Sequence, residues 1–270
     1  MIDPATLAAV PAGLRLAALF VIGLCLGSFV NVVIHRLPRG ASLAGPRSRC
    51  PQCGATIAWY DNIPLLSYVL LRGRCRRCRH GISWRYPIVE LLGGLLTVGT
   101  VLQAEWMGVG WGVGLARLLF ALALLAVIFI DLDLQIIPDW ITLPGIAAGL
   151  LSAAWGPLGL VDALLGVLVG AGALLLLALG YRAATGRDGL GMGDVKLMAM
   201  VGAFLGWQGA SATLLLGSLA GSAVGVALVL RGRGTRRTAL PFGTFLAPAA
   251  WVVLFLGSVL WSWYVASWRG

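Results

Sequence analysis

The run Leu160-Val-Asp-Ala-Leu-Leu-Gly-Val-Leu-Val-Gly-Ala-Gly-Ala-Leu-Leu-Leu-Leu-Ala-Leu-Gly-Tyr181 decides the fold class of this 270-residue chain, because Asp162 is its only charged residue. A helix of about 20 apolar residues covers the hydrocarbon core of a bilayer. Similar runs lie at about residues 14–34, 87–104, 114–131, 139–155, 194–208, 210–230 and 243–266. The sequence therefore predicts an all-α polytopic membrane protein with about eight transmembrane helices.

The overall composition excludes a soluble enzyme. Hydrophobic residues make up 59% of the chain and charged residues only 11%, whereas soluble domains carry about 25% charged residues. No basic leader precedes the first apolar run and no convincing cleavage site follows it, so we expect a retained anchor rather than a removed signal peptide.

The positive charge is concentrated in one polar segment. Ten arginines fall between Arg36 and Arg85, and the chain carries a formal net charge of +10. Because basic loops stay in the cytoplasm, we expect this insert inside the cell and the N-terminus outside. We expect it to contact anionic lipid and not nucleic acid, since few aromatic residues interleave with the arginines. The expected domains are a first helix (1–34), the insert (35–86) and a seven-helix membrane domain (87–270).

Four cysteines on the insert form two Cys-x-x-Cys pairs, Cys50 with Cys53 and Cys75 with Cys78. Four thiolates complete a closed tetrahedral zinc shell, which predicts a structural Zn²⁺ site. A disulfide pairing would need the insert outside the cell, against the charge distribution, and a redox or iron site is the remaining alternative. The fifth cysteine lies in an apolar run, and we expect both histidines to be polar residues without a metal.

Acidic residues are few, and four of them lie at the expected inner ends of helices. Asp131, Asp133 and Asp139 occur in Ile130-Asp-Leu-Asp-Leu-Gln-Ile-Ile-Pro-Asp139, and Asp194 occurs in Gly191-Met-Gly-Asp-Val-Lys196. Ionisable groups near the hydrocarbon are costly and usually functional. A carboxylate pair that shares one proton can activate a water and protonate a leaving amide nitrogen. The topology places Asp131 and Asp194 at the same face of the membrane, and it predicts peptide hydrolysis by this pair if helix packing, which the sequence alone does not show, makes them neighbours.

Each of these residues also has a simpler interpretation. Asp139 and Asp194 would suit the start of a helix, where the dipole favours negative charge. Asp133 would be a solvated loop acid, and Lys196 would extend its amine to the membrane surface.

Two other functional classes use the same kinds of residue. A proton-coupled transporter places its acids near the midplane, often in matching halves, whereas these acids lie at helix ends and no repeat is visible. Alternatively, Asp131 and Asp133 would bind Mg²⁺ for phosphoryl or glycosyl transfer.

Several motifs together resemble the type IV prepilin peptidases, in order and over most of the chain. They are Gly27-Ser-Phe-Val-Asn-Val-Val-Ile-His-Arg-Leu-Pro38, Arg49-Cys-Pro-Gln-Cys53, Trp59-Tyr-Asp-Asn-Ile-Pro64, Leu71-Arg-Gly-Arg-Cys-Arg-Arg-Cys78, Ile82-Ser-Trp-Arg-Tyr-Pro-Ile-Val-Glu90, Ile137-Pro-Asp139 and Gly191-Met-Gly-Asp-Val-Lys-Leu197.

This resemblance implies a bifunctional enzyme of the bacterial inner membrane that serves type IV pili and type II secretion. Such enzymes cut the basic leader from prepilins and pseudopilins at the cytoplasmic face, then N-methylate the new terminus with S-adenosylmethionine. Carried over, the catalytic aspartates are Asp131 and Asp194, with Asp133 as a rival for the first role. The resemblance does not locate the methyl-donor pocket, for which Asn31, Arg36 and Glu90 are candidates. A peptidase without methylation is the alternative.

Overall fold

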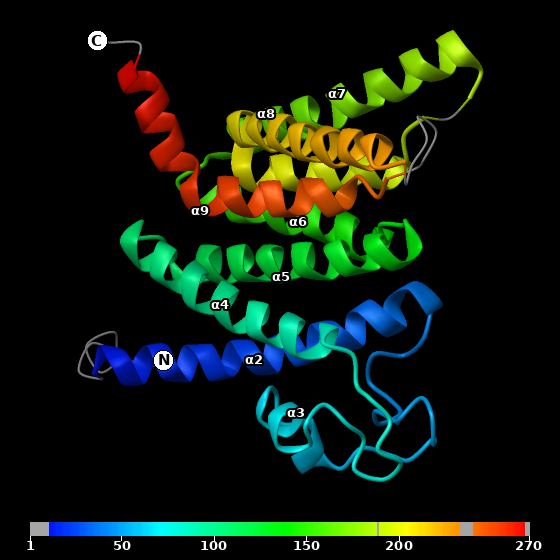
Figure 1. Cartoon of the computed structure of the whole chain (residues 1–270). Helices are drawn as coiled ribbons and strands as arrows, with labels where there is room; N and C mark the ends of the chain where they lie inside the picture. Colours follow the sequence, from blue (N-terminus) through cyan, green and yellow to red (C-terminus); the bar gives the residue numbers. More distant parts are fainter. Residues whose placement is uncertain (1–10, 188, 233–239, 268–270) are drawn as a thin grey trace. The chain divides into compact units, whose positions relative to one another are not determined.

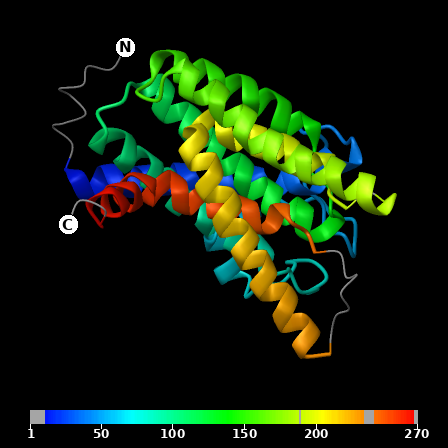
Figure 2. The same ribbon diagram turned by 90° about the horizontal axis from the view of Figure 1, so that it is seen from above.

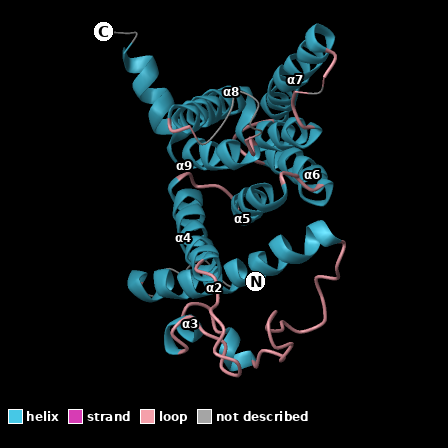
Figure 3. Ribbon diagram, turned by 45° about the vertical axis from the view of Figure 1, so that its right-hand side comes forward, coloured by secondary structure: helices cyan, strands magenta, loops and turns pink. Residues whose placement is uncertain are grey.

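The structure is a computed structural model that describes residues 11–187, 189–232 and 240–267. These residues form helices joined by loops (Figure 3). Within them, strand-like pairing is limited to two isolated bridges, Arg49 with Thr56 and Arg74 with Gly81. The predicted all-α fold class is confirmed.

The long helices coincide with the apolar runs of the sequence. They are α2 (Ala12–Arg36), α4 (Arg85–Trp106), α5 (Trp111–Leu134), α6 (Asp139–Trp155), α7 (Leu160–Thr185), α8 (Met192–Leu230) and α9 (Gly243–Ser267). The insert between α2 and α4 contains the short helices η1 (Leu37–Arg39), η2 (Trp59–Asn62) and α3 (Leu66–Leu70). In the described part of the chain, five helices are long and apolar enough to cross a membrane: α2, α4, α5, α7 and α8. The chain is therefore a membrane protein.

Helix α8 contains two of the predicted runs, 194–208 and 210–230. Its backbone leaves the helical conformation at Gly206, where φ is 69° and ψ is −177°. Only glycine adopts this conformation without strain, so Gly206 divides α8 into two legs. The second leg forms the long yellow-to-orange helix of Figure 2.

The chain divides into two compact units, Met1–Leu102 and Gln103–Gly270. The first unit contains α2, the insert and most of α4. The second contains α5 to α9. The expected boundaries after residues 34 and 86 stay predictions.

In the first unit, glycines let α2 and α4 approach closely. A Cβ placed on Gly27 would lie 2.7 Å from the Val89 carbonyl oxygen, and one on Gly93 would lie 2.6 Å from the Gly27 Cα. Small residues at such a crossing are the usual basis of helix association in membranes, where the hydrophobic effect gives little preference for helix over lipid.

In the second unit, α8 is the central element. It packs against α6, α7 and α9, and α5 packs against α6 and α9 (Figure 1). Phe120 of α5 stacks on Phe204 of α8 with ring centroids 4.3 Å apart. This packing brings the last turn of α5, the first turn of α8 and the start of α9 together, and these three helix ends contain the candidate site.

Candidate active site and metal site

Asp131 and Asp194 are brought together by helix packing in the second unit. Asp131 lies in the last turn of α5 and is 4% exposed, while Asp194 lies in the first turn of α8 and is half-buried. The two carboxylates are close enough to interact electrostatically. The proximity that the sequence alone could not establish is therefore present in the fold.

The start of α9 supplies hydrogen bonds to Asp131. The backbone N–H of Thr244 donates to Asp131 Oδ2 at 2.8 Å, and the Thr244 hydroxyl donates to the same oxygen at 3.1 Å. The neighbouring Gly243 leaves no room for a side chain, since a Cβ there would lie 3.0 Å from Asp131 Oδ2. Sequence reasoning missed both residues, because they meet Asp131 only through the packing of α9 on α5.

Asp194 has its own backbone partner. The Gly191 amide hydrogen-bonds to the Asp194 carboxylate, and a Cβ on Gly191 would come within 3.3 Å of Asp194 Oδ2. The Gly-x-Gly-Asp sequence thus forms a compact turn around the carboxylate at the beginning of α8.

The two other residues of interest in these segments have different surroundings. Asp139 is the first residue of α6, preceded by Pro138 at the N-cap as expected, and both of its carboxylate oxygens accept hydrogen bonds from Lys196 Nζ, at 2.7 and 2.8 Å. Lys196 thus pairs with a carboxylate instead of only extending to the membrane surface. Asp133, the rival of Asp131, is exposed.

Four cysteines in the Cys50–Cys78 region of the first unit form a group that could hold a metal ion. The sulfurs of Cys50, Cys53, Cys75 and Cys78 all lie within 4.8 Å of one another, and those of Cys50 and Cys78 are 3.8 Å apart. A tetrahedral shell with Zn–S bonds of about 2.3 Å places its sulfurs about 3.8 Å apart, so the group fits such an ion. All five cysteines of the chain are free of disulfide bonds.

Each Cys-x-x-Cys pair is folded by the same backbone turn. Cys50 N–H donates to the Ala55 carbonyl at 2.9 Å, and Cys75 N–H donates to the His80 carbonyl at 2.8 Å. The isolated bridges, Arg49 with Thr56 and Arg74 with Gly81, close the two turns. We call these turns the first and second knuckle.

The knuckle backbones favour thiolates at one position of each pair. Amides of Cys53 and Gln52 hydrogen-bond to the Cys50 sulfur and lower the pKa of its thiol to about 6. Amides of Cys78 and Arg77 likewise lower the pKa of the Cys75 thiol. A backbone hydrogen bond at His80 also lowers the pKa of Cys78, but burial and the neighbouring thiols outweigh it and raise that pKa to about 11. A bound cation would stabilise the full set of thiolates.

A cavity of about 300 Å³ lies between α2 and the insert in the first unit. Its lining includes Arg36, Arg47, Trp59 and Asn62. Arg36 also donates to the Ser42 and Gly45 carbonyl oxygens, each at 3.0 Å, and thereby fixes the loop at the cavity edge. The cavity is therefore lined by guanidinium, indole and amide groups.

The two remaining candidates near the insert have structural contacts. Glu90 accepts a hydrogen bond from the Leu65 backbone N–H at 2.9 Å, and Leu65 has a positive φ of 59°. The Asn31 amide donates to the Tyr86 carbonyl at 3.1 Å. Glu90 therefore holds a strained turn of the insert against α4.

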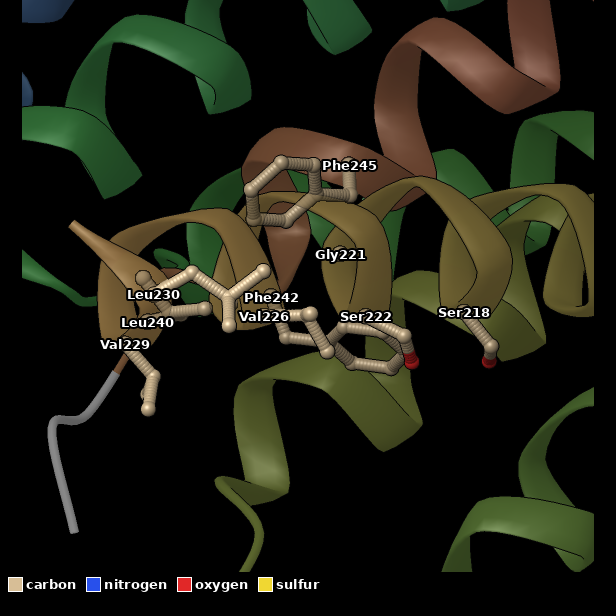
Figure 4. Close-up of a pocket in the computed structure, with 10 residues that line it drawn as sticks. Ser218, Gly221, Ser222, Val226, Val229, Leu230, Leu240, Phe242 and Phe245 are labelled. Atoms are coloured by element: carbon tan, nitrogen blue, oxygen red, sulfur yellow. The ribbon is translucent and has the colours of Figure 1, made fainter. Parts of the chain in front are cut away.

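An apolar groove of about 560 Å³ runs between the second leg of α8 and the start of α9 (Figure 4). Phe242 and Phe245 lie on the α9 side, directly flanking Gly243 and Thr244. The α8 side includes Ser218, Ser222 and Val226. Ser218 and Ser222 are small residues four positions apart, a spacing that lets another helix approach closely.

Two family models match the chain. The model for the bacterial peptidase A24 N-terminal domain matches residues 21–104, and the model for the type IV leader peptidase family matches residues 118–226. The boundary between the matches falls near the division between the two compact units.

Curated relatives named prepilin leader peptidase/N-methyltransferase match most of the chain. The protein of Aeromonas hydrophila is 40% identical over 94% of this chain and 95% of its own length. The protein of Stutzerimonas stutzeri is 41% identical over 96% of both chains. The protein of Myxococcus xanthus is 46% identical over 82% of this chain and 65% of its own length. No solved structure matches the chain.

Proposed function

The chain belongs to the type IV leader peptidase family, and from that premise we propose that it cleaves the leader from prepilins and then N-methylates the new amino terminus. The observation that carries the proposal is the meeting of Asp131 and Asp194 at the ends of α5 and α8. Two interacting carboxylates at helix ends have the chemistry of an aspartic peptidase.

In the proposed reaction, Asp131 and Asp194 share one proton. The ionised carboxylate removes a proton from a water, whose oxygen attacks the carbonyl carbon of the scissile peptide bond. The neutral carboxyl group then protonates the amide nitrogen as the carbon–nitrogen bond breaks. Thr244 orients Asp131 through its two hydrogen bonds, and the Gly191 amide orients Asp194.

The second reaction needs a methyl donor. S-adenosylmethionine supplies the methyl group for the new terminal amine. We propose the cavity lined by Arg36, Arg47, Trp59 and Asn62 as its binding site. We also propose that the four cysteines bind Zn²⁺ as a structural ion, because a closed shell of four thiolates leaves no position for water or substrate.

The charge distribution and the family support a proposal for the location of the enzyme. We propose that it lies in the bacterial inner membrane, with its N-terminus outside and the arginine-rich insert and both aspartates facing the cytoplasm. Anionic lipids would contact the insert. Pseudopilins of type II secretion are proposed as additional substrates, because they present the same kind of leader.

The groove beside the start of α9 supports a membrane-embedded substrate. A segment that occupies it within the bilayer must satisfy its own backbone groups, which favours a helix. We propose that the apolar segment of the prepilin binds there, because Phe242 and Phe245 line the groove and flank the residue that holds Asp131. The scissile bond would then lie at the end of that helix.

A mass-spectrometric cleavage assay tests the peptidase assignment. Purified full-length protein is mixed with a prepilin and S-adenosylmethionine, alongside the Asp131→Asn, Asp194→Asn and Asp133→Asn variants. We expect leader removal to fall by more than about 10³-fold in the first two variants, because each removes a group that transfers a proton. We expect Asp133→Asn to cut like the parent protein.

The same spectra test methylation. The mature chain should gain the mass of one methyl group, and leader removal without that gain would indicate a peptidase-only enzyme. If Asp131→Asn and Asp194→Asn both still cut, the proposed mechanism is wrong.

A further inference from the structure

The ion pair between Asp139 and Lys196 joins the two chain segments that carry the candidate aspartates. Asp139 is the first residue of α6 and follows the short loop after α5, whose last turn contains Asp131. Lys196 lies two residues beyond Asp194 in the same helical turn. Both carboxylate oxygens accept from Lys196 Nζ, at 2.7 and 2.8 Å. The pair therefore links the start of α6 to the start of α8.

Lys196 does not act by touching Asp194. Residues two apart on a helix point away from each other, so the Lys196 side chain faces α6 while the Asp194 carboxylate faces Asp131. The backbone of the first turn of α8 nevertheless links the two residues directly.

A second contact shows that the first turn of α8 packs tightly against the loop that precedes α6. A Cβ on Gly193 would lie 3.0 Å from the Ile137 Cβ, so the Gly193 backbone packs directly against Ile137. On its other side, the Ile137 Cδ1 atom would lie 2.8 Å from a Cβ on Gly243. Ile137 thus separates the starts of α8 and α9, and the ion pair holds α8 against it.

We propose that Asp139 and Lys196 are positioning residues that set the approach of Asp194 to Asp131. The inference rests on the proposed aspartic peptidase function. Half-exposed ion pairs contribute little to stability, and the side chains of Lys196 and Asp139 are 34% and 53% exposed. The pair should therefore affect the geometry of the carboxylates more than the folding of the protein.

The test compares Lys196→Met, Lys196→Arg and the double exchange Asp139→Lys/Lys196→Asp in full-length protein in phospholipid nanodiscs. Leader cleavage, methylation of a pre-cleaved pilin and the melting temperature are measured for each. We expect Lys196→Met to lower kcat for cleavage by about 10- to 100-fold with an unchanged KM, as a displacement of about 1 Å would. Methylation and melting temperature should stay at parental values.

Rescue distinguishes positioning from a general requirement for the residues. Lys196→Arg and the double exchange should recover most of the cleavage, since each restores an attraction across the same gap. The inference is overturned if Lys196→Met cuts at the parental rate, if neither rescue variant recovers activity, or if methylation and melting temperature fall together with cleavage. The Asp194→Asn variant distinguishes failure of this inference from failure of the proposed function. If Asp194→Asn cleaves the leader at the parental rate, the aspartic peptidase mechanism itself is wrong.

Discussion

Gly54 and Arg79 occupy the same place in the two knuckles, directly after the second cysteine of each pair. Both have a left-handed backbone, with φ of 66° at Gly54 and 59° at Arg79. Glycine adopts this conformation freely, whereas a residue with a Cβ is strained there. The second knuckle therefore holds a strain that the first avoids.

Substitutions at these two positions should change the stability of the folded insert in opposite directions. Gly54→Ala should destabilise the folded insert by about 1 kcal/mol, because nothing but the backbone conformation opposes the added methyl group. Arg79→Gly should stabilise it by a similar amount. Both effects are measured as the zinc retained by full-length protein against a competing chelator. An equal loss of zinc in both variants would contradict the strain argument.

At the level of the helices, glycine contacts set the packing of the second unit. The backbones of Gly166 in α7 and Gly202 in α8 meet directly, without space for a Cβ on either residue. Gly172 lies on the same helix α7, but nothing approaches within 4 Å of a Cβ placed there. A comparison of Gly166→Ala with Gly172→Ala therefore measures the effect of the contact between α7 and α8 on stability.

We expect Gly166→Ala to lower the free energy of unfolding by about 1–3 kcal/mol through overpacking. Gly172→Ala should leave it unchanged or raise it by up to about 1 kcal/mol, because alanine favours helix more than glycine does. Thermal unfolding in detergent checks both values. A matched loss at the two positions would contradict the argument that the contact between Gly166 and Gly202 makes the difference.

The apolar runs, and the residues such as Pro138 that begin helices, predicted the helices. A helix that crosses a bilayer needs a continuous apolar stretch, which is visible in the local sequence. The signal was weakest at 194–208, where the helix is interrupted two residues before the end of the run, at Gly206. The partners of Asp131 at Thr244 could not be predicted in this way. They depend on which face of α9 meets α5, and that choice is made by tertiary packing.

At the scale of the whole molecule, the two reactions are assigned to different units. The cysteines and the cavity beside Trp59 belong to the first unit, whereas Asp131 and Asp194 belong to the second. Charge and cysteine spacing predicted the metal group, whereas the catalytic role of Asp131 and Asp194, expected from their helix ends and from the family resemblance, stays a prediction. Of the residues that line the proposed methyl-donor cavity, sequence reasoning named only Arg36 as a candidate, because the lining comes from three separated stretches.

Removal of the metal should separate the two activities. We expect zinc chelation, or Cys50→Ser, to lower methylation more than leader cleavage, since the metal organises the unit that contains the cavity. Trp59→Ala should lower methylation alone. Parallel cleavage and methylation assays on one preparation check this. An equal loss of both activities would contradict the assignment of methylation to the first unit and cleavage to the second.

The break at Gly206 also bears on whether the chain crosses the membrane an even or an odd number of times. Helix α8 has 39 residues, which as one straight helix would be about 58 Å long, nearly twice the hydrocarbon core of about 30 Å. If each leg crosses the membrane once, the described helices make an even number of crossings, and both ends of the protein lie on the same side. A single crossing by α8 would put the ends on opposite sides. Alkaline phosphatase fused after Gly270 should therefore be active outside the cytoplasm.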